Sequence, residues 1–233
     1  MINPADFESG QIMLVNKPFG WTSFDVVKKI RCLLEKKEGK TIKVGHAGTL
    51  DPYATGLLIL CTGKATKKIQ FIQDTEKEYT GIIQLGATTP SYDLETMPDK
   101  TFPTEHIDSE KVQKVITQFI STQMQVAPIY SAKMVEGKRA YDLARKGESV
   151  QLNAHPIVIT AFDARLEENY QIIFRVRCSK GTYIRSLAHD LGIALQSGAY
   201  LASLTRTAIG EYLLTDALTP KEWETKLLAS VTI

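Results

Sequence analysis

The residues best suited to chemistry lie in one glycine-rich stretch, from Lys43 to Lys64. Asp51 is the only acid in this stretch, and His46 precedes it by five residues. Four glycines and Pro52 punctuate the stretch, which predicts a tight, shaped loop around the acid. A carboxylate presented on such a loop can act as a nucleophile. The alternative is that Asp51 only forms an Asx-turn with Pro52, and residue types and spacing alone do not decide between the two.

The elements that position this loop can be predicted from the neighbouring sequence. The apolar run Leu57–Cys61 follows the loop directly and predicts a short buried strand. Residues 11–16 predict another strand, and residues 17–20 predict a turn after it. Residues 22–25, Thr-Ser-Phe-Asp, are close to a capping box and predict a helix that ends near Gly39.

The rest of the chain predicts further helices and strands in mixed order. Helices are expected over residues 65–72, 109–120, 137–147 and 183–195, with one more from residue 220. Strands are expected over residues 77–86, 126–132, 150–166, 170–178 and 201–213. Because helices and strands do not strictly alternate, we expect an α+β fold with a large, mainly antiparallel mixed sheet flanked by helices. Residues 1–233 are expected to form a single domain, since no repeat or low-complexity linker is visible.

Composition narrows the class of protein. No apolar run approaches the roughly 20 residues of a membrane helix, and residues 1–10 lack the layout of a signal peptide. The sequence therefore predicts a cytoplasmic protein. Cys32, Cys61 and Cys178 are far apart and odd in number, so we expect buried thiols rather than a disulfide framework or a zinc site.

Charge is distributed unevenly along the chain. The net charge is only +2, but basic residues gather in 28–43 and 133–146, and acidic residues gather in 93–110. Such asymmetry allows a basic face on a near-neutral protein. For residues 28–40 an ordinary solvated helix face is the preferred interpretation.

Several motifs together resemble one family. The segment Gly45–Gly56, which contains Gly-Thr-Leu-Asp-Pro, resembles the signature loop of the TruB family of tRNA pseudouridine synthases. Further segments resemble motifs of the same family in family order, and they begin at residues 16, 77, 130, 178 and 204. The resemblance runs from residue 14 to about residue 210, nearly the whole chain.

The resemblance implies an activity and a catalytic residue. The family isomerises a uridine to pseudouridine within RNA, and the implied target is the uridine at position 55 in the T-loop of tRNA. Asp51 matches the family nucleophile, and it could attack either C1′ of the ribose or C6 of the base. The reaction adds no group and has no net redox change, so neither a cofactor nor a metal is expected.

Other site residues are implied in the same way. Arg185 would be the ionic partner that keeps Asp51 charged, and Tyr79 would stack on the uracil and help remove the C5 proton. Tyr183 and Leu204 would line the pocket. Core packing is a serious alternative for Tyr79, Tyr183 and Leu204, and a surface helix position is the alternative for Arg185. Two residues would support the catalytic loop, Lys17 and Pro18.

The expected partner is the T-arm stem-loop of tRNA, bound by a monomer without guide RNA. His46 resembles the family residue that fills the space left by extruded bases, and it is not expected to bind a metal. Candidate phosphate contacts are Lys64, Lys67, Lys133, Lys138, Arg139 and Arg145. The family often carries a C-terminal RNA-binding extension of the PUA type, and no full one is expected after residue 210. Thr205 stands where a basic residue is frequent, so one phosphate contact is expected to be missing.

Two rival interpretations remain from the sequence. One is the guide-RNA-dependent relative, which shares the Gly-Thr-Leu-Asp-Pro loop but needs the extension. The other is a non-catalytic module that binds or folds tRNA, although binding alone would not require Asp51, Tyr79 and Arg185 together. A tRNA-folding activity is also conceivable as a second role of the enzyme.

Overall fold

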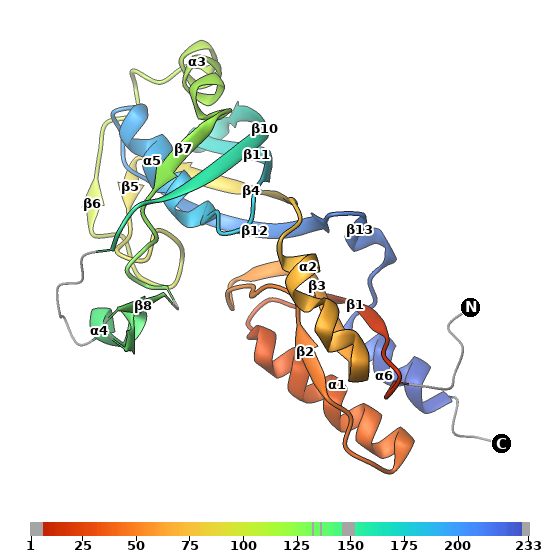
Figure 1. The fold of residues 1–233 in the computed structure, drawn as a ribbon. Coiled ribbons are helices and arrows are strands. Elements are labelled where there is room, and N and C mark those ends of the chain that lie inside the picture. The colour runs from red at the N-terminus through yellow and green to blue at the C-terminus, as the bar shows by residue number, and fades with distance from the viewer. Residues whose placement is uncertain (1–6, 132, 136, 146–151, 230–233) are drawn as a thin grey trace. The chain divides into compact units, whose positions relative to one another are not determined.

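The computed structural model describes residues 7–131, 133–135, 137–145 and 152–229 (Figure 1). The chain divides into two compact units. Unit 1 contains residues 1–79 and 205–233, and unit 2 contains residues 80–204. The expectation of a single catalytic domain stays a prediction, and each unit is described by itself below.

The largest sheet has nine strands. Its hydrogen-bonded order is β1-β3-β12-β4-β11-β10-β7, and in addition β2 pairs with β3 and β13 pairs with β12. The pairs β1/β3, β2/β3, β12/β13, β10/β11 and β7/β10 are antiparallel. Helices accompany this sheet, so the expected α+β class with a large mixed sheet is confirmed. Two further pairs of short strands, β5/β6 and β8/β9, lie outside this sheet.

Unit 1 is built around β3 (Ala54–Thr62), which pairs with β1 (Ile12–Lys17) and β2 (Val44–His46) and also neighbours β12 in the sheet. Alternate side chains of β3 enter different apolar clusters: Leu58 and Leu60 pack with α1 (Ser23–Glu38), and Leu57, Ile59 and Cys61 pack on the other face. Both faces of β3 are therefore covered, which explains its uninterrupted apolar sequence.

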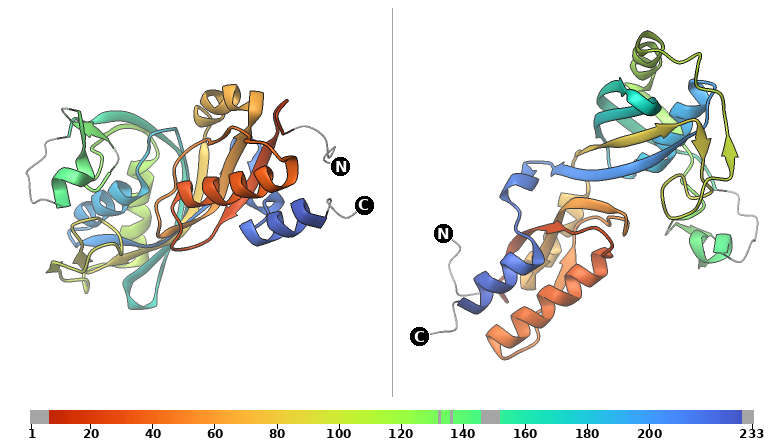
Figure 2. Two further views of the ribbon diagram at one scale, coloured as in Figure 1. Left: turned by 90° about the horizontal axis from the view of Figure 1, so that it is seen from below. Right: turned by 180° about the vertical axis from the view of Figure 1, so that it is seen from behind.

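The helices of unit 1 cover the two faces of its strands (Figure 2). α1 lies beside α6 (Pro220–Leu228), where Lys29 Nζ is 2.8 Å from Glu224 Oε2. On the opposite face a 3-10 turn (η1, Gly63–Lys68) leads into α2 (Ile69–Gln73). The expected single helix over 65–72 is therefore in two parts. A second 3-10 turn, η3 (Leu214–Asp216), follows β13 (Tyr212–Leu213).

The beginning of α1 follows the sequence prediction closely. Thr22 Oγ1 accepts from Asp25 N, and Asp25 Oδ2 accepts from Thr22 N at 2.8 Å, which completes a capping box. The helix ends at Gly39, which adopts a left-handed conformation with φ of 66°. Cys32 on this helix is exposed, so the expectation of a buried thiol is wrong there, while Cys61 and Cys178 are buried.

Unit 2 contains the long hairpin of β10 (His155–Glu167) and β11 (Gln171–Cys178), joined by η2 (Glu168–Tyr170). In β11 the side chains alternate between buried and exposed, as its period-two sequence predicts. Aromatic rings connect the hairpin to α3 (Ser109–Phe119). The Phe162 ring packs edge-on against Phe174 and against Phe119 of α3, with ring centroids 6.2 Å and 6.4 Å apart.

The remaining elements of unit 2 differ from prediction mainly in their ends. The strand expected over 126–132 is wrong: β7 spans Thr122–Gln125, and the chain that follows contains Pro128, which has no N–H for a ladder. The strand expected from residue 150 is observed only from His155. The helix expected over residues 137–147 is observed as the short strand β9 followed by the helix α4, whose last described residue is Arg145. Residues 146–151 lie outside the described chain. Other bounds are β4 (Lys77–Leu85), β5 (Ala87–Thr88), β6 (Lys100–Thr101), β8 (Met134–Val135), β9 (Lys138–Arg139), α4 (Ala140–Arg145), α5 (Ile184–Ala194) and β12 (Ala199–Ile209).

Candidate functional site

Asp51 lies in the loop between β2 and β3 of unit 1. β2 pairs with the far end of β3 through Gly45 opposite Cys61 and His46 opposite Leu60. Ala47 N then donates to Ile59 O at 2.9 Å before the chain leaves the sheet. The loop therefore returns onto the strand that follows it, and Asp51 stands on a short connection anchored at both ends.

Both chain neighbours of Asp51 are held in place by other elements. Leu50 N donates to Ser23 Oγ at 2.8 Å, and Ser23 Oγ donates to Leu50 O at 3.0 Å. On the other side, Pro52 O accepts from Gly20 N at 2.9 Å. Because residues 50 and 52 are fixed, the backbone that carries the Asp51 carboxylate has little freedom, which suits a nucleophile that must meet one atom of its substrate.

Two glycines of the loop are required by its geometry. Gly48 and Gly56 have φ of 107° and 102°, which side chains disfavour. At Gly56 a Cβ would also lie 2.4 Å from the carbonyl oxygen of Arg206. The residue before Arg206 in β12, Thr205, has its hydroxyl 2.9 Å from that of Thr55 in β3. Thr205, where one phosphate contact is expected to be missing, therefore pairs with the beginning of β3.

Arg206 is a buried residue beside the Asp51 loop that the sequence did not single out. Its guanidinium is buried and donates to three loop and strand carbonyls, from Nε to Leu57 O at 2.8 Å, from Nη2 to Gly48 O at 3.0 Å and from Nη1 to Thr49 O at 3.3 Å. The donors of a guanidinium are spread over three nitrogens in a planar fork and can reach carbonyls that lie apart, whereas all donors of an ammonium start from one nitrogen. The signals in the sequence are an arginine within a predicted strand and its place in the family-like segment that begins at residue 204, and neither assigned it a role.

We expect Arg206→Met to lower the free energy of unfolding by about 2–4 kcal/mol, because the hydrogen bonds of a buried guanidinium to three carbonyls are lost. Urea unfolding of the purified variant measures this loss. Arg206→Lys should recover little of it. Arg177→Met is the control: it removes an arginine from the exposed face of β11 and should change stability by no more than about 0.5 kcal/mol. Equal losses in the two Met variants would contradict the role of Arg206 as a clamp.

Lys17 supports the loop from β1. It is fully buried, and its Nζ donates to Trp21 O at 2.6 Å, to Pro18 O at 3.0 Å and to Pro52 O at 3.3 Å. Burial lowers the pKa of the Lys17 ammonium to about 8, although the negative charge of Asp51 acts in the opposite direction. The structure thus places Lys17 against the loop and within the electrostatic field of Asp51, and Pro18 contributes a carbonyl to the same arrangement.

His46 is half-buried at the start of the loop. Burial lowers the pKa of its imidazole below 6.5, the positive charge of Arg206 adds to this, and the backbone of Gly48 acts in the opposite direction. The imidazole is therefore neutral at pH 7, which is the form that stacks and accepts hydrogen bonds.

The lowered pKa of His46 predicts a pH-dependent stability. Because the unfolded chain takes up this proton first as the pH falls below 6.5, the contribution of neutral His46 is present above pH 6.5 and is lost as the pH falls through the folded pKa. Urea unfolding of wild type and His46→Gln at pH 8, 7, 6 and 5 should show a wild-type advantage that shrinks toward pH 5. A difference that stays constant over this range would show that His46 titrates alike in both states.

Arg185 lies at the first turn of α5 in unit 2 and is buried. Its Nε is 3.6 Å from Asp93 Oδ2, and its Nη1 donates to Tyr130 O at 3.0 Å and to Ser91 O at 3.4 Å. Asp93 is also buried and was not singled out by the sequence. Arg185 is therefore not the surface helix arginine of the alternative interpretation, and a buried carboxylate and two carbonyls hold it. Its pairing with Asp51 stays a prediction.

The three candidate pocket residues lie on different elements. Tyr79 is buried in β4, directly after Lys77 and Glu78, which are buried as well. Tyr183 precedes α5; its backbone N–H donates to Gln125 Oε1 at 2.8 Å and its carbonyl accepts from Gln125 Nε2 at 3.1 Å. Leu204 is half-buried in β12. The role of Tyr79 in stacking on the uracil and in removal of the C5 proton stays a prediction, as do the roles of Tyr183 and Leu204 as pocket lining.

The candidate phosphate contacts are described to different extents. Lys64 and Lys67 are exposed on η1, and Lys133 Nζ donates to Asn153 O at 3.2 Å. Lys138 and Arg139 lie in β9 and Arg145 ends α4, but their side chains are outside the described part of the structure. The phosphate contacts of these residues stay predictions.

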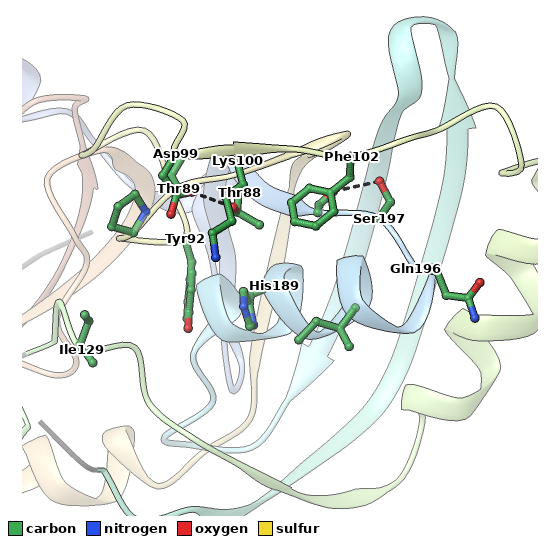
Figure 3. Close-up of a pocket in the computed structure, with 13 residues that line it drawn as sticks. Thr88, Thr89, Tyr92, Asp99, Lys100, Phe102, Ile129, His189, Gln196 and Ser197 are labelled. Carbon is green, nitrogen blue, oxygen red and sulfur yellow. Dashed lines mark hydrogen bonds between the residues drawn. The ribbon is translucent and has the colours of Figure 1, made fainter. Parts of the chain in front are cut away.

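A cavity of about 570 Å³ lies elsewhere in unit 2, between α5 and the β5/β6 hairpin (Figure 3). The Tyr92 and His189 rings stand side by side at its wall, with centroids 4.0 Å apart. Burial and the nearby acids Asp190 and Asp99 raise the pKa of the Tyr92 hydroxyl. No residue that the sequence singles out for chemistry is among those that line this cavity.

The described residues hold neither a metal-binding cluster nor a membrane-spanning helix. Over residues 7–131, 133–135, 137–145 and 152–229, no three His, Cys, Asp or Glu side chains gather in a group that could hold a metal ion. Within the same residues, no helix combines the length and the apolar character needed to cross a membrane.

Comparisons with known proteins agree on one family. Residues 35–184 match the family described as TruB family pseudouridylate synthase (N terminal domain). A Bacteroides thetaiotaomicron protein named tRNA pseudouridine synthase B is 54% identical over 226 residues, with 94% of each chain covered. A protein of the same name from Flavobacterium johnsoniae is 49% identical over 219 residues, with 93% of this chain and 96% of the relative covered.

Solved structures extend the likeness to the fold. A Cbf5-Nop10-Gar1 complex contains a chain with a TM-score of 0.64 and 26% identity, over 88% of this chain and 51% of that chain. An H/ACA RNP bound to a substrate RNA containing 2'-deoxyuridine matches with a TM-score of 0.67 and 23% identity, over 96% and 56% of the two chains. This chain thus spans about half the length of the solved chains that it matches.

Proposed function

The chain belongs to the TruB family of pseudouridylate synthases, and we propose that it isomerises the uridine at position 55 in the T-loop of tRNA to pseudouridine. The observation that carries the proposal is the presentation of Asp51. It is the one acid of a glycine-shaped loop, and hydrogen bonds to Ser23 and Gly20 fix both of its chain neighbours. The relatives that are about half identical are named tRNA pseudouridine synthase B, which supports tRNA as the substrate.

The proposed reaction needs a nucleophile but no added group. The bond between N1 and C1′ breaks, the base rotates, and C5 forms a bond to C1′ while the C5 proton leaves and N1 gains a proton. Asp51 is the nucleophile, either at C1′, where positive charge develops, or at C6 of the base. Electrons and atoms balance within the substrate, so the enzyme uses neither a metal nor an organic cofactor.

The surrounding residues take supporting roles in this proposal. Lys17 and Arg206 hold the loop through its carbonyls, and Pro18 contributes one of the carbonyls that Lys17 binds. Arg185 pairs with Asp51 and keeps it ionised in a desolvated site. Tyr79 stacks on the uracil and assists removal of the C5 proton. Tyr183 and Leu204 complete the pocket.

Recognition of the RNA requires extrusion of the target base. A loop uridine in folded tRNA is stacked and must leave the stack before chemistry. Neutral His46 fills the space that the bases leave, and the lysines and arginines named above contact phosphates. The enzyme acts as a monomer in the cytoplasm without a guide RNA, and folding of tRNA is its proposed second role.

The test is incubation of the purified protein with an unmodified tRNA transcript in the presence of a chelator and without guide RNA. Pseudouridine is then mapped by position. The proposal expects it at position 55 alone, and a transcript with cytidine there should gain none. Absence of pseudouridine from the first transcript, or its appearance only after a guide RNA is added, would overturn the proposal.

A further inference from the structure

Exposed aromatic rings gather around the Asp51 loop. Phe19 and Tyr53 are 59% and 40% exposed, and Phe24 is 61% exposed. Among the described residues of unit 1, the one other exposed aromatic side chain of this kind is Phe71, at 77% on α2. Three of these four rings therefore lie on segments that touch the catalytic loop, and together we call Phe19, Phe24 and Tyr53 the aromatic surface.

Each ring of the aromatic surface stands on backbone that is tied to the loop. Tyr53 follows Pro52, whose carbonyl accepts from Gly20 N at 2.9 Å, and Gly20 follows Phe19. The Phe19 and Tyr53 rings are in tilted contact, with centroids 5.3 Å apart and an angle of 56° between their planes. Phe24 follows Ser23, which exchanges two hydrogen bonds with Leu50.

The supports of these rings are buried even though the rings are not. Lys17 Nζ donates to the carbonyls of both Pro18 and Pro52, so it joins the chain segments that carry Phe19 and Tyr53. Ser23 is buried beneath the loop. The rings are therefore presented to solvent from a fixed base, and little conformational entropy would be lost if a partner covered them.

An unpaired nucleotide is the partner that fits this position. Tyr53 is two residues from Asp51, so a substrate whose uridine reaches Asp51 brings its neighbouring nucleotides to the same loop. Extrusion of the uridine also removes a stacking partner from those neighbours. Aromatic side chains stack on bases of any sequence, since every base has a π-face.

We propose that the aromatic surface stacks on one or more unpaired nucleotides next to the target uridine and so holds the opened loop of the RNA against Asp51. The inference rests on the proposed function, because it is the substrate of that reaction that brings RNA to this loop. It adds a recognition surface of aromatic rings to the phosphate contacts of the lysines and arginines.

The test measures binding in an Asp51→Asn background, so that no turnover occurs. The RNA is an unmodified T-arm hairpin with 2-aminopurine placed in turn at each position flanking the target uridine. Phe19→Leu/Tyr53→Leu removes both rings of the contacting pair but keeps apolar side chains. We expect its Kd to rise at least tenfold, and at one or more positions the quenching of 2-aminopurine on binding should be lost. Phe71→Leu is the matched control and should stay within twofold, and Tyr53→Phe should retain both binding and quenching.

The outcomes separate this inference from the proposed function. If the double variant unfolds at the same temperature as its parent and keeps its Kd within twofold with full quenching, the inference is wrong, whether or not the wild type makes pseudouridine. If the double variant loses binding and quenching, the surface binds RNA even if the wild type forms no pseudouridine, in which case the proposed function alone fails. A lower mass in solution for the double variant, with unchanged RNA binding, would assign the surface to a second copy of this chain and would overturn the inference.

Discussion

Asp51→Asn is expected to yield a folded protein that forms no detectable pseudouridine. Asn is nearly isosteric and can still cap the turn before Pro52, and the bonds of Ser23 to Leu50 and of Gly20 to Pro52 do not involve the side chain. The amide cannot act as an anionic nucleophile, so the chemical step should stop. Binding of a T-arm hairpin should stay within about tenfold of wild type, or ~1.4 kcal/mol.

Thermal unfolding, hairpin affinity and pseudouridine yield should be measured on one preparation of this variant. Asp163→Asn, which makes the same change on the exposed face of β10, is the control and should keep wild-type yield. If Asp51 only shapes a turn, its variant should also retain turnover near the wild-type rate. That result would remove Asp51 from the mechanism.

Arg185→Met is expected to lower turnover by about a thousandfold, or ~4 kcal/mol of transition-state stabilisation, because the proposed nucleophile loses its charged partner. The structure adds a second expectation. Asp93 Oδ2 lies 3.6 Å from Arg185 Nε, and both side chains are buried. The variant therefore leaves the Asp93 carboxylate buried without the positive charge of Arg185. This should also cost about 3–5 kcal/mol of stability.

A double variant separates these two effects. Arg185→Met/Asp93→Asn removes both charges and should recover much of the lost stability without recovering turnover. Arg185→Lys should rescue poorly, since one ammonium cannot serve Asp93, Ser91 and Tyr130 as the planar fork does. Stability is measured by urea unfolding and turnover in single-turnover assays with hairpin saturating. Recovery of both quantities together in the double variant would show that Arg185 is structural and that its proposed pairing with Asp51 is wrong.

Features encoded by neighbouring residues could be predicted from the sequence. The capping box of Thr22 and Asp25, the helix end at Gly39 and the alternation of β11 all depend on residues a few positions apart. The buried strand β3 was also predictable, because a short, continuous apolar run is typical of a strand that is covered on both faces. The shape of the loop followed from its glycines, two of which have positive φ that only glycine adopts easily.

Features that depend on distant residues could not be predicted in this way. Arg206 bonds to Gly48 and Thr49, which lie 158 and 157 positions earlier, and no local pattern marks that contact. The same holds for the ion pair of Arg185 with Asp93, and for the meeting of the Phe19 and Tyr53 rings. The misplaced strand at 126–132 has a local cause, because β-forming residues there compete with a proline that cannot join a ladder.

The central claim, that Asp51 isomerises a uridine of tRNA, is tested most directly by release of tritium from C5. Isomerisation replaces the C5–H bond with C5–C1′, so tRNA labelled with tritium at C5 of its uridines must lose one tritium for each uridine converted. We predict that wild-type protein releases one tritium per tRNA to water and that Asp51→Asn releases none. Equal release by the two proteins, or no release by either of them when both are folded and bound to RNA, would contradict the account.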